Sequence, residues 1–238
     1  MEDTRKMKQL LITIAAVVLV GCGPSVPDIS IHSAAAIGNI QAVKQHFESG
    51  INLNAKEDVY GAVPLHMAAA NGNKKIAEFL ITKGADLNAR NDNGGTPLVY
   101  AAQIGHKEVA ELLIDKGADV DEEDGFGATP LRHAVGKGHK EIAEMLIAAG
   151  ADVNWIGKQA GTTLLHEASI KGQKEVAKLL IAKGVNINAK VASGPKQGLT
   201  ALDAAHETNH PETADLLRKH GAKTSDELKA EGKLNTPK

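Results

Sequence analysis

The chain has 238 residues, of which 42% are hydrophobic and 24% are charged, an ordinary composition for a globular protein. Its formal net charge of -2 lacks the strongly basic balance of a nucleic-acid-binding domain, so we expect no nucleic-acid partner. Aromatic residues make up only 3%, which is low for one large core but suits a stack of small helices packed through alanine and leucine.

Residues 1–22 have the pattern of an export signal. Three basic residues precede an apolar run over 10–20, which is too short for a stable membrane anchor. The run ends in Leu19-Val20-Gly21-Cys22, which resembles the lipobox of bacterial lipoproteins. That resemblance implies that Cys22 is lipidated and becomes the mature N-terminus. A plain secretory signal, or an uncleaved anchor in which Cys22 is incidental, is the alternative.

Residues 23–27 form a short tether with two prolines, which reaches less than about 20 Å at about 3.3 Å per residue. The lipoprotein resemblance also bears on location, because an Asp after the lipidated cysteine is typical of retention in the inner membrane. Gly23 stands at that position. We therefore expect a lipid-anchored protein of the bacterial cell envelope, at the periplasmic face of the outer membrane rather than the inner membrane.

The stretch 94–121 predicts two short helices with their end signals. Thr96 can cap the first helix, and Pro97 fits its first turn. Gly105 and Gly117 are placed to end the two helices. The second helix has apolar residues at the i, i+3, i+4 spacing of one buried face. Since two helices this short cannot bury their faces alone, we expect copies on each side.

Two markers of this stretch recur along the chain with the same spacings of 34, 33, 33, 34 and 37 residues. The first is an aliphatic residue in the first helix, found at Ile31, Leu65, Leu98, Leu131, Leu165 and Leu202. The second is the glycine that ends the second helix, found at Gly50, Gly84, Gly117, Gly150, Gly184 and Gly221. Two series that keep one step predict a repeat protein.

The motifs Thr96-Pro97-Leu98-Val99-Tyr100-Ala101 and Thr129-Pro130-Leu131-Arg132-His133-Ala134 identify the repeat as similar to the ankyrin family. The resemblance implies an all-α solenoid of six helix-turn-helix repeats with short β-hairpin-like fingers, which are the turns that join successive repeats. The domain is expected over 28–222, with repeats at about 28–55, 56–89, 90–122, 123–155, 156–189 and 190–222. Residues 223–238 are expected to form a short capping helix, about Asp226–Ala230, and a disordered tail.

We find no sequence motif for catalysis. A Gly-x-Ser-x-Gly nucleophile, a Gly-x-Gly-x-x-Gly loop and a phosphate-binding P-loop are all missing. The ankyrin resemblance implies that His32, His66 and His166 brace neighbouring turns, and no His-x-x-x-His pair offers a helical metal site. Cys22 is the only cysteine, so no disulfide or cysteine metal site can form. We expect neither an enzyme, a cofactor, a metal nor a small-molecule substrate.

The few aromatic residues suggest where a partner binds, because interfaces concentrate binding energy in Tyr, Trp and Arg. By the resemblance, fingers and first helices line the concave face that holds partners, and two isoleucines stand at concave positions. The candidate partner-binding residues are Tyr60, Tyr100, Ile104, Phe126, Trp155 and Ile170. Packing between fingers is the alternative for Tyr60 and Phe126.

Five acidic residues crowd one finger between Asp119 and Asp124. They form either a solvated turn or a docking site for a basic partner, or a weak calcium site. The combined reading is a non-catalytic module that binds another protein and is tethered to the membrane through Cys22. The alternative function is an inhibitor or immunity protein that neutralises an envelope enzyme or toxin, with the acidic finger mimicking a charged substrate.

Overall fold

The structure is a computed structural model that describes residues 28–159 and 161–234. The expected signal segment 1–22 with Cys22 and the tether 23–27 lie outside the described residues. Those residues that are described form thirteen helices and no strand, and none of these helices is long and apolar enough to cross a membrane. This confirms the predicted all-α repeat solenoid.

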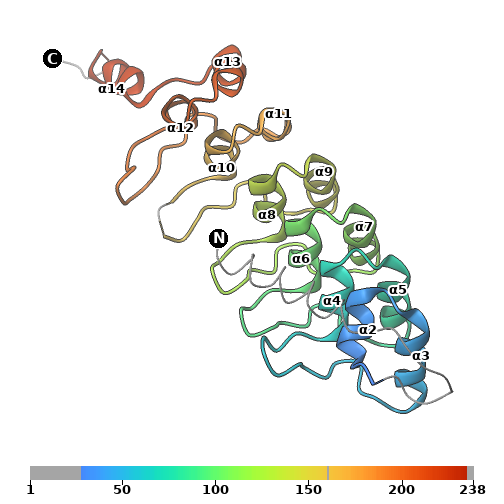
Figure 1. Cartoon of the computed structure of the whole chain (residues 1–238). Coiled ribbons are helices and arrows are strands. Elements are labelled where there is room, and N and C mark those ends of the chain that lie inside the picture. The colour runs from blue at the N-terminus through green and yellow to red at the C-terminus, as the bar shows by residue number, and fades with distance from the viewer. Residues whose placement is uncertain (1–27, 160, 235–238) are drawn as a thin grey trace. The chain divides into compact units, whose positions relative to one another are not determined.

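The chain divides into two compact units. The first comprises the residues up to Ala101 together with Glu108–Ala118, and the second comprises Ala102–Lys107 and the residues from Asp119 onward. The helices of the first unit are α2 (Ile31–Ile37), α3 (Ile40–Glu48), α4 (Pro64–Ala70), α5 (Lys74–Thr82) and α7 (Lys107–Asp115), and α6 (Pro97–Ile104) crosses the boundary between the units. Within this unit α2 packs on α3 and α4, and α4 packs on α5 (Figure 1).

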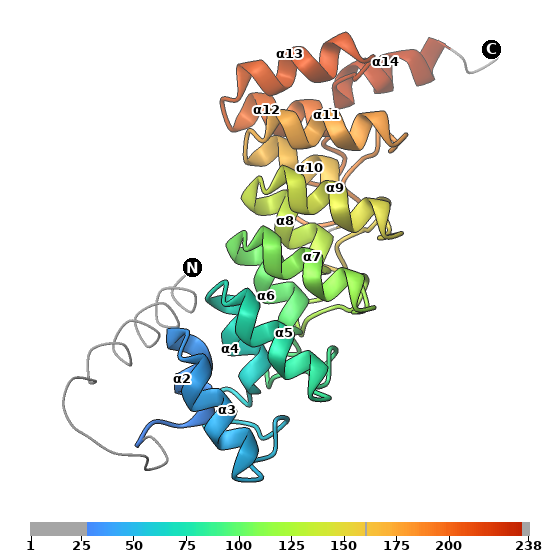
Figure 2. The same ribbon diagram turned by 90° about the vertical axis from the view of Figure 1, so that its right-hand side faces the viewer.

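The second unit repeats the same helix pair three times and ends in a single helix. Its helices are α8 (Pro130–Lys137), α9 (Lys140–Ala148), α10 (Leu164–Ile170), α11 (Lys174–Ala182), α12 (Ala201–Glu207), α13 (Pro211–Lys219) and α14 (Ser225–Leu234). The first helices α8, α10 and α12 pack on one another in one layer, and the second helices α9, α11 and α13 form the next layer (Figure 2). Fingers project from the layer of first helices.

The core follows the predicted repeat. The aliphatic residue of each first helix is buried, with exposed fractions of 4% at Ile31 and 1% or less at Leu65, Leu98, Leu131, Leu165 and Leu202. Alanines beside them are buried as well, and their small side chains let neighbouring helices approach closely. Threonine hydroxyls at Thr129, Thr163 and Thr200 accept backbone N–H groups at the starts of α8, α10 and α12, as expected of helix caps.

The C-terminal helix is longer than the sequence suggests. Asp203 occupies the position at which three other first helices carry histidine, and its Oδ2 accepts the N–H of Ser225 at 2.8 Å. This carboxylate therefore links α12 to the start of α14. Lys223 pairs with Glu231 at 2.6 Å, and the helix continues through Gly232 to Leu234. The capping helix expected over about Asp226–Ala230 therefore extends from Ser225 to Leu234.

Histidine side chains connect successive repeats, which confirms the predicted bracing role. In the first unit the Nε2–H of His66 donates to the carbonyl of Gly95 at 2.9 Å, and its Nδ1 accepts the N–H of Val63 at 3.2 Å. His66 is only 2% exposed. Burial lowers the pKa of His66 to about 4, against the opposing effect of its hydrogen bond to the carbonyl of Gly95. The ring is therefore neutral at pH 7, with its proton on Nε2.

This neutral brace makes the first unit sensitive to mild acid. Between pH 6.5 and 4, His66 binds a proton in the unfolded chain but not in the folded chain. The free energy of unfolding therefore falls as the pH is lowered through this range. Between pH 6.5 and pH 5 the loss should be about 2 kcal/mol. We expect denaturant unfolding at pH 7.5 and pH 5 to show this loss in the wild type and a smaller one in His66→Gln. Equal losses in the two proteins would contradict the assignment.

Candidate protein-binding surface

The six predicted binding residues differ in how far they reach the surface. Phe126 is 74% exposed, whereas Tyr60, Ile104, Trp155 and Ile170 are partly buried. Tyr100 is only 8% exposed. The prediction for Tyr100 as an exposed residue of the concave face is therefore wrong.

Tyr100 is buried because its ring packs into the base of a finger. The hydroxyl accepts a hydrogen bond from Asn91 Nδ2 at 2.7 Å, and the ring meets His66 edge-on with centroids 5.7 Å apart. The ring also lies against Gly95, where a Cβ atom would come within 3.1 Å of it. These contacts make Tyr100 part of the packing of the first unit.

Trp155 joins two neighbouring fingers of the second unit. Its Nε1–H donates to the carbonyl of Gly127 at 3.1 Å, and the guanidinium carbon of Arg132 lies 5.7 Å from its ring centroid. This distance is within the range of a cation–π contact. Lys158 forms an ion pair with Glu123 across the same two fingers. The fingers at 122–127 and 155–158 therefore lie side by side, with the indole bridging them.

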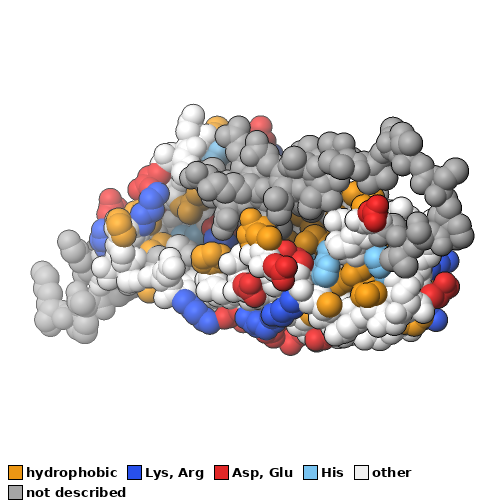
Figure 3. Space-filling view, turned by 60° about the horizontal axis from the view of Figure 1, so that its bottom comes forward, with side chains coloured by type: hydrophobic (Ala, Val, Ile, Leu, Met, Phe, Trp, Pro, Cys, Tyr) orange, Lys and Arg blue, Asp and Glu red, His pale blue; other side chains and the backbone are white. Residues whose placement is uncertain are grey.

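Two large apolar side chains are exposed on these fingers, Phe126 at 74% and Ile156 at 59%. We call Phe126, Trp155 and Ile156, together with Arg132 under the indole, the finger patch. On the face drawn in Figure 3, exposed hydrophobic side chains are interspersed with charged ones and histidines. Tyr60 lies on a finger of the first unit and is not part of the patch.

Ile156 is a member of the patch that the sequence reading missed. It follows Trp155 in an extended segment, and its backbone bridges Thr163 in an antiparallel pair. Because neighbouring side chains of an extended segment point to opposite sides, one of the two can pack on Arg132 while the other stays exposed. An apolar pair at a fingertip was the signal that could have revealed it.

Asp124 fixes the turn that carries Phe126. It is 9% exposed, its Oδ1 accepts the N–H groups of Phe126 and Ala128 at 2.9 Å each, and its Oδ2 lies 2.7 Å from His133 Nε2. Burial acts to raise the pKa of Asp124, but the hydrogen bonds from His133 and from the two backbone N–H groups outweigh it and lower the pKa. Asp124 is therefore an ionised structural group.

The rest of the acidic run also has local contacts. Asp119 accepts the N–H of Asp121, and Asp121 accepts the N–H of Asp152, both at 3.0 Å. Across residues 28–159 and 161–234, no cluster of three or more His, Cys, Asp or Glu side chains could hold a metal ion. These contacts favour a structural turn over a docking or calcium site.

Ile104 and Ile170, the two isoleucines expected at concave positions, are each only partly exposed. Ile170 lines a separate pocket of about 240 Å³ below the finger 190–198. Ile104 is the last residue of α6.

The Asp124–His133 pair can be tested against its counterpart one repeat earlier. Asn91 and Tyr100 stand at the equivalent positions and form a neutral hydrogen bond at 2.7 Å. Asp124→Asn alone should destabilise the protein by about 1–2 kcal/mol, because a charged acceptor is lost. Combining it with His133→Tyr should recover about 1 kcal/mol through the restored pair. Urea unfolding of the four proteins measures the coupling, and strict additivity of the two single changes would contradict it.

Comparison with known proteins agrees with the repeat architecture. A family model described as ankyrin repeats (3 copies) matches residues 31–124, 88–156, 116–191 and 155–227. No curated protein sequence matched the chain significantly. The overlapping matches extend from residue 31 to residue 227 and include every helix from α2 to α13. The chain therefore belongs to the ankyrin repeat family.

Proposed function

We propose that the protein is a non-catalytic binding module that recognises another protein through the finger patch. Ankyrin repeats are generally protein–protein interaction modules. The observation that carries the proposal is the exposure of Phe126 and Ile156 beside the Trp155–Arg132 contact. Tryptophan and arginine are enriched among the residues that dominate binding energy, and two exposed apolar side chains stand on the same pair of fingers.

The contacts within the patch favour binding with little loss of conformational freedom. The hydrogen bond from Trp155 to Gly127 and the ion pair from Lys158 to Glu123 hold the two fingers together. Asp124 holds the turn beneath Phe126. A surface that is ordered before binding loses less entropy when a partner docks.

We also propose that the module is held at the cell envelope by lipid on Cys22, at the periplasmic face of the outer membrane. The support is the lipobox-like sequence before Cys22 and the short tether after it. The tether is short enough to keep the first repeat close to the membrane surface. The alternative is an inhibitor or immunity protein in which the acidic finger mimics a charged substrate, and it has less support because Glu123 and Asp124 make contacts within the protein.

The finger patch predicts a selective loss of binding. The double variant Phe126→Ala, Trp155→Ala should no longer capture a partner from detergent-solubilised envelope. Its affinity for a purified partner should fall at least about tenfold, as expected when two anchor residues are truncated. Val59→Ala is the matched control, since Val59 is an exposed apolar finger residue of the first unit, 62% exposed. Equal capture by the wild type and both variants would place binding elsewhere.

The lipid anchor predicts a change of fraction. Cys22→Ser should move the protein from the membrane fraction to the soluble fraction, and should end labelling by a radioactive fatty acid. Ser25→Ala, a small change in the tether, should alter neither. Continued labelling of Cys22→Ser would contradict lipidation at this residue.

A further inference from the structure

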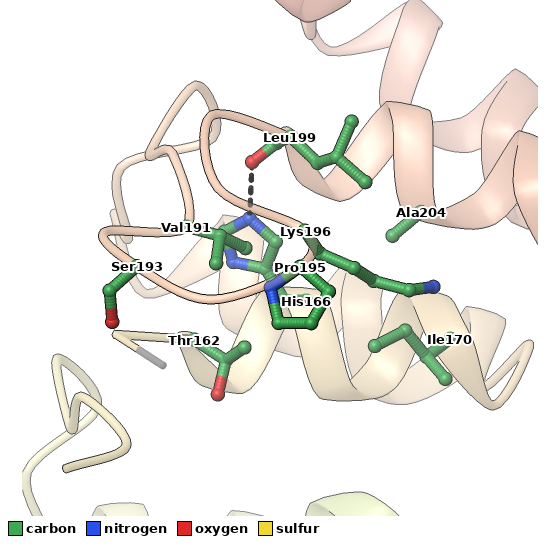
Figure 4. A pocket seen from close by; sticks show the side chains of 9 residues that line it. All are labelled: Thr162, His166, Ile170, Val191, Ser193, Pro195, Lys196, Leu199 and Ala204. Carbon is green, nitrogen blue, oxygen red and sulfur yellow. Dashed lines mark hydrogen bonds between the residues drawn. The ribbon is translucent and has the colours of Figure 1, made fainter. Parts of the chain in front are cut away.

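A pocket lies in the same unit as the finger patch, between helices α10 and α12 and the long finger 190–198 (Figure 4). Its volume is about 240 Å³. Aliphatic and proline carbons form most of its wall, and they come from Ile170 on α10, Ala204 on α12, and Val191, Pro195 and Leu199 on the finger. Thr162, His166, Ser193 and Lys196 complete the lining.

The finger that roofs the pocket is ordered by its own hydrogen bonds. The N–H of Val191 donates to Leu199 at 2.9 Å, and the N–H of Gly198 donates back to Val191 at 2.8 Å. Ser193 Oγ donates to the carbonyl of Gln159 in the preceding finger at 3.3 Å. The pocket is therefore formed before any ligand arrives.

His166, which lines the pocket, is neutral at pH 7. His166 is 1% exposed, and its Nε2–H donates to the carbonyl of Leu199 at 3.1 Å. Its Nδ1 accepts the N–H of Thr163 at 3.2 Å, which leaves no room for a second proton. Burial, the largest cause, lowers the pKa of His166. The interior therefore suits an uncharged, apolar group.

One charged side chain, Lys196, belongs to the lining of the pocket. Lys196 extends along the wall past Ile170 (Figure 4), and its Nζ lies 2.9 Å from Glu207 Oε2, with both side chains about half exposed. Lys171 and Lys190 on the adjoining elements are exposed and are not part of the lining. Glu167, the other acidic residue nearby on α10, faces Arg132 at 3.7 Å. Because a lysine ammonium has three donors, Lys196 can bind an incoming carboxylate while it keeps Glu207.

The size of the pocket limits what it can hold. Sites for whole small molecules span roughly 300–1,000 Å³, so a recess of about 240 Å³ is better matched to one side chain of a larger partner. We propose that it receives an aliphatic side chain of the partner protein, from a segment that places a carboxylate beside it on Lys196. This inference rests on the proposed protein-binding function and adds a second anchor to the finger patch.

N-acetyl-L-leucinate carries an aliphatic side chain and a carboxylate, and it serves as the probe. We expect millimolar additions to the full chain to give saturable NMR shifts in the methyl groups of Ile170, Val191 and Leu199. N-acetyl-L-leucinamide, which lacks the carboxylate, should bind about two- to fivefold more weakly, the range of an exposed ion pair. N-acetylglycinate, which lacks the aliphatic group, should give no saturable shift of these methyls.

Lysine variants locate the carboxylate. Lys196→Gln should lower the affinity for N-acetyl-L-leucinate about two- to fivefold and leave the affinity for N-acetyl-L-leucinamide unchanged. Lys190→Gln is the matched control, since it removes the same charge from the same finger outside the pocket lining, and it should change neither affinity.

Three results would overturn the proposal. If no saturable methyl shifts appear, the pocket is not a binding site. Equal affinities for N-acetyl-L-leucinate and its amide would show that a carboxylate does not contribute to binding. Tighter binding of octanoate than of N-acetyl-L-leucinate would point to a fatty acid instead of a protein segment. This titration needs no partner and leaves the finger patch intact, so its failure is distinguishable from failure of the proposed function.

Discussion

The structure depends on one constraint: no helix pair can bury its apolar face without the next pair. Each first helix is only seven or eight residues long, too short to be stable alone. Burial of Leu131 and Leu165 against neighbouring repeats supplies the stability. Polar contacts then fix the register between repeats. His166 reaches Leu199 in the next turn, and Asp121 accepts the N–H of Asp152 in the next finger.

The same constraint leaves the fingers free to vary in chemistry, because only their bases take part in the packing. Asn91 with Tyr100 and Asp124 with His133 occupy equivalent positions and close the finger base in the same way. The first pair buries an aromatic ring. The second replaces that ring with an imidazole, and the aromatic residue Phe126 stands exposed at the fingertip instead. The repeat thus keeps its frame while the exposed surface changes.

The repeat frame could be predicted because its signals are local in sequence. The Leu98 series and the terminating glycines depend only on helix period and turn conformation, and they located the helices to within a few residues. Tyr100 could not be placed in this way, since its burial depends on Asn91, Gly95 and His66, which meet it only in the folded chain. The pocket beside Ile170 was also out of reach, because it forms where a lengthened finger folds back over α10 and α12.

Photo-cross-linking in the intact cell tests the central claim, that the finger patch holds a protein partner. Phe126→p-benzoylphenylalanine keeps an aromatic group at the fingertip and reports on whatever lies against it. The matched position is Val59, which is exposed to a similar degree on another finger. The account predicts one discrete protein adduct at position 126 and none at position 59. An adduct at position 59 alone, or none at position 126, would contradict it.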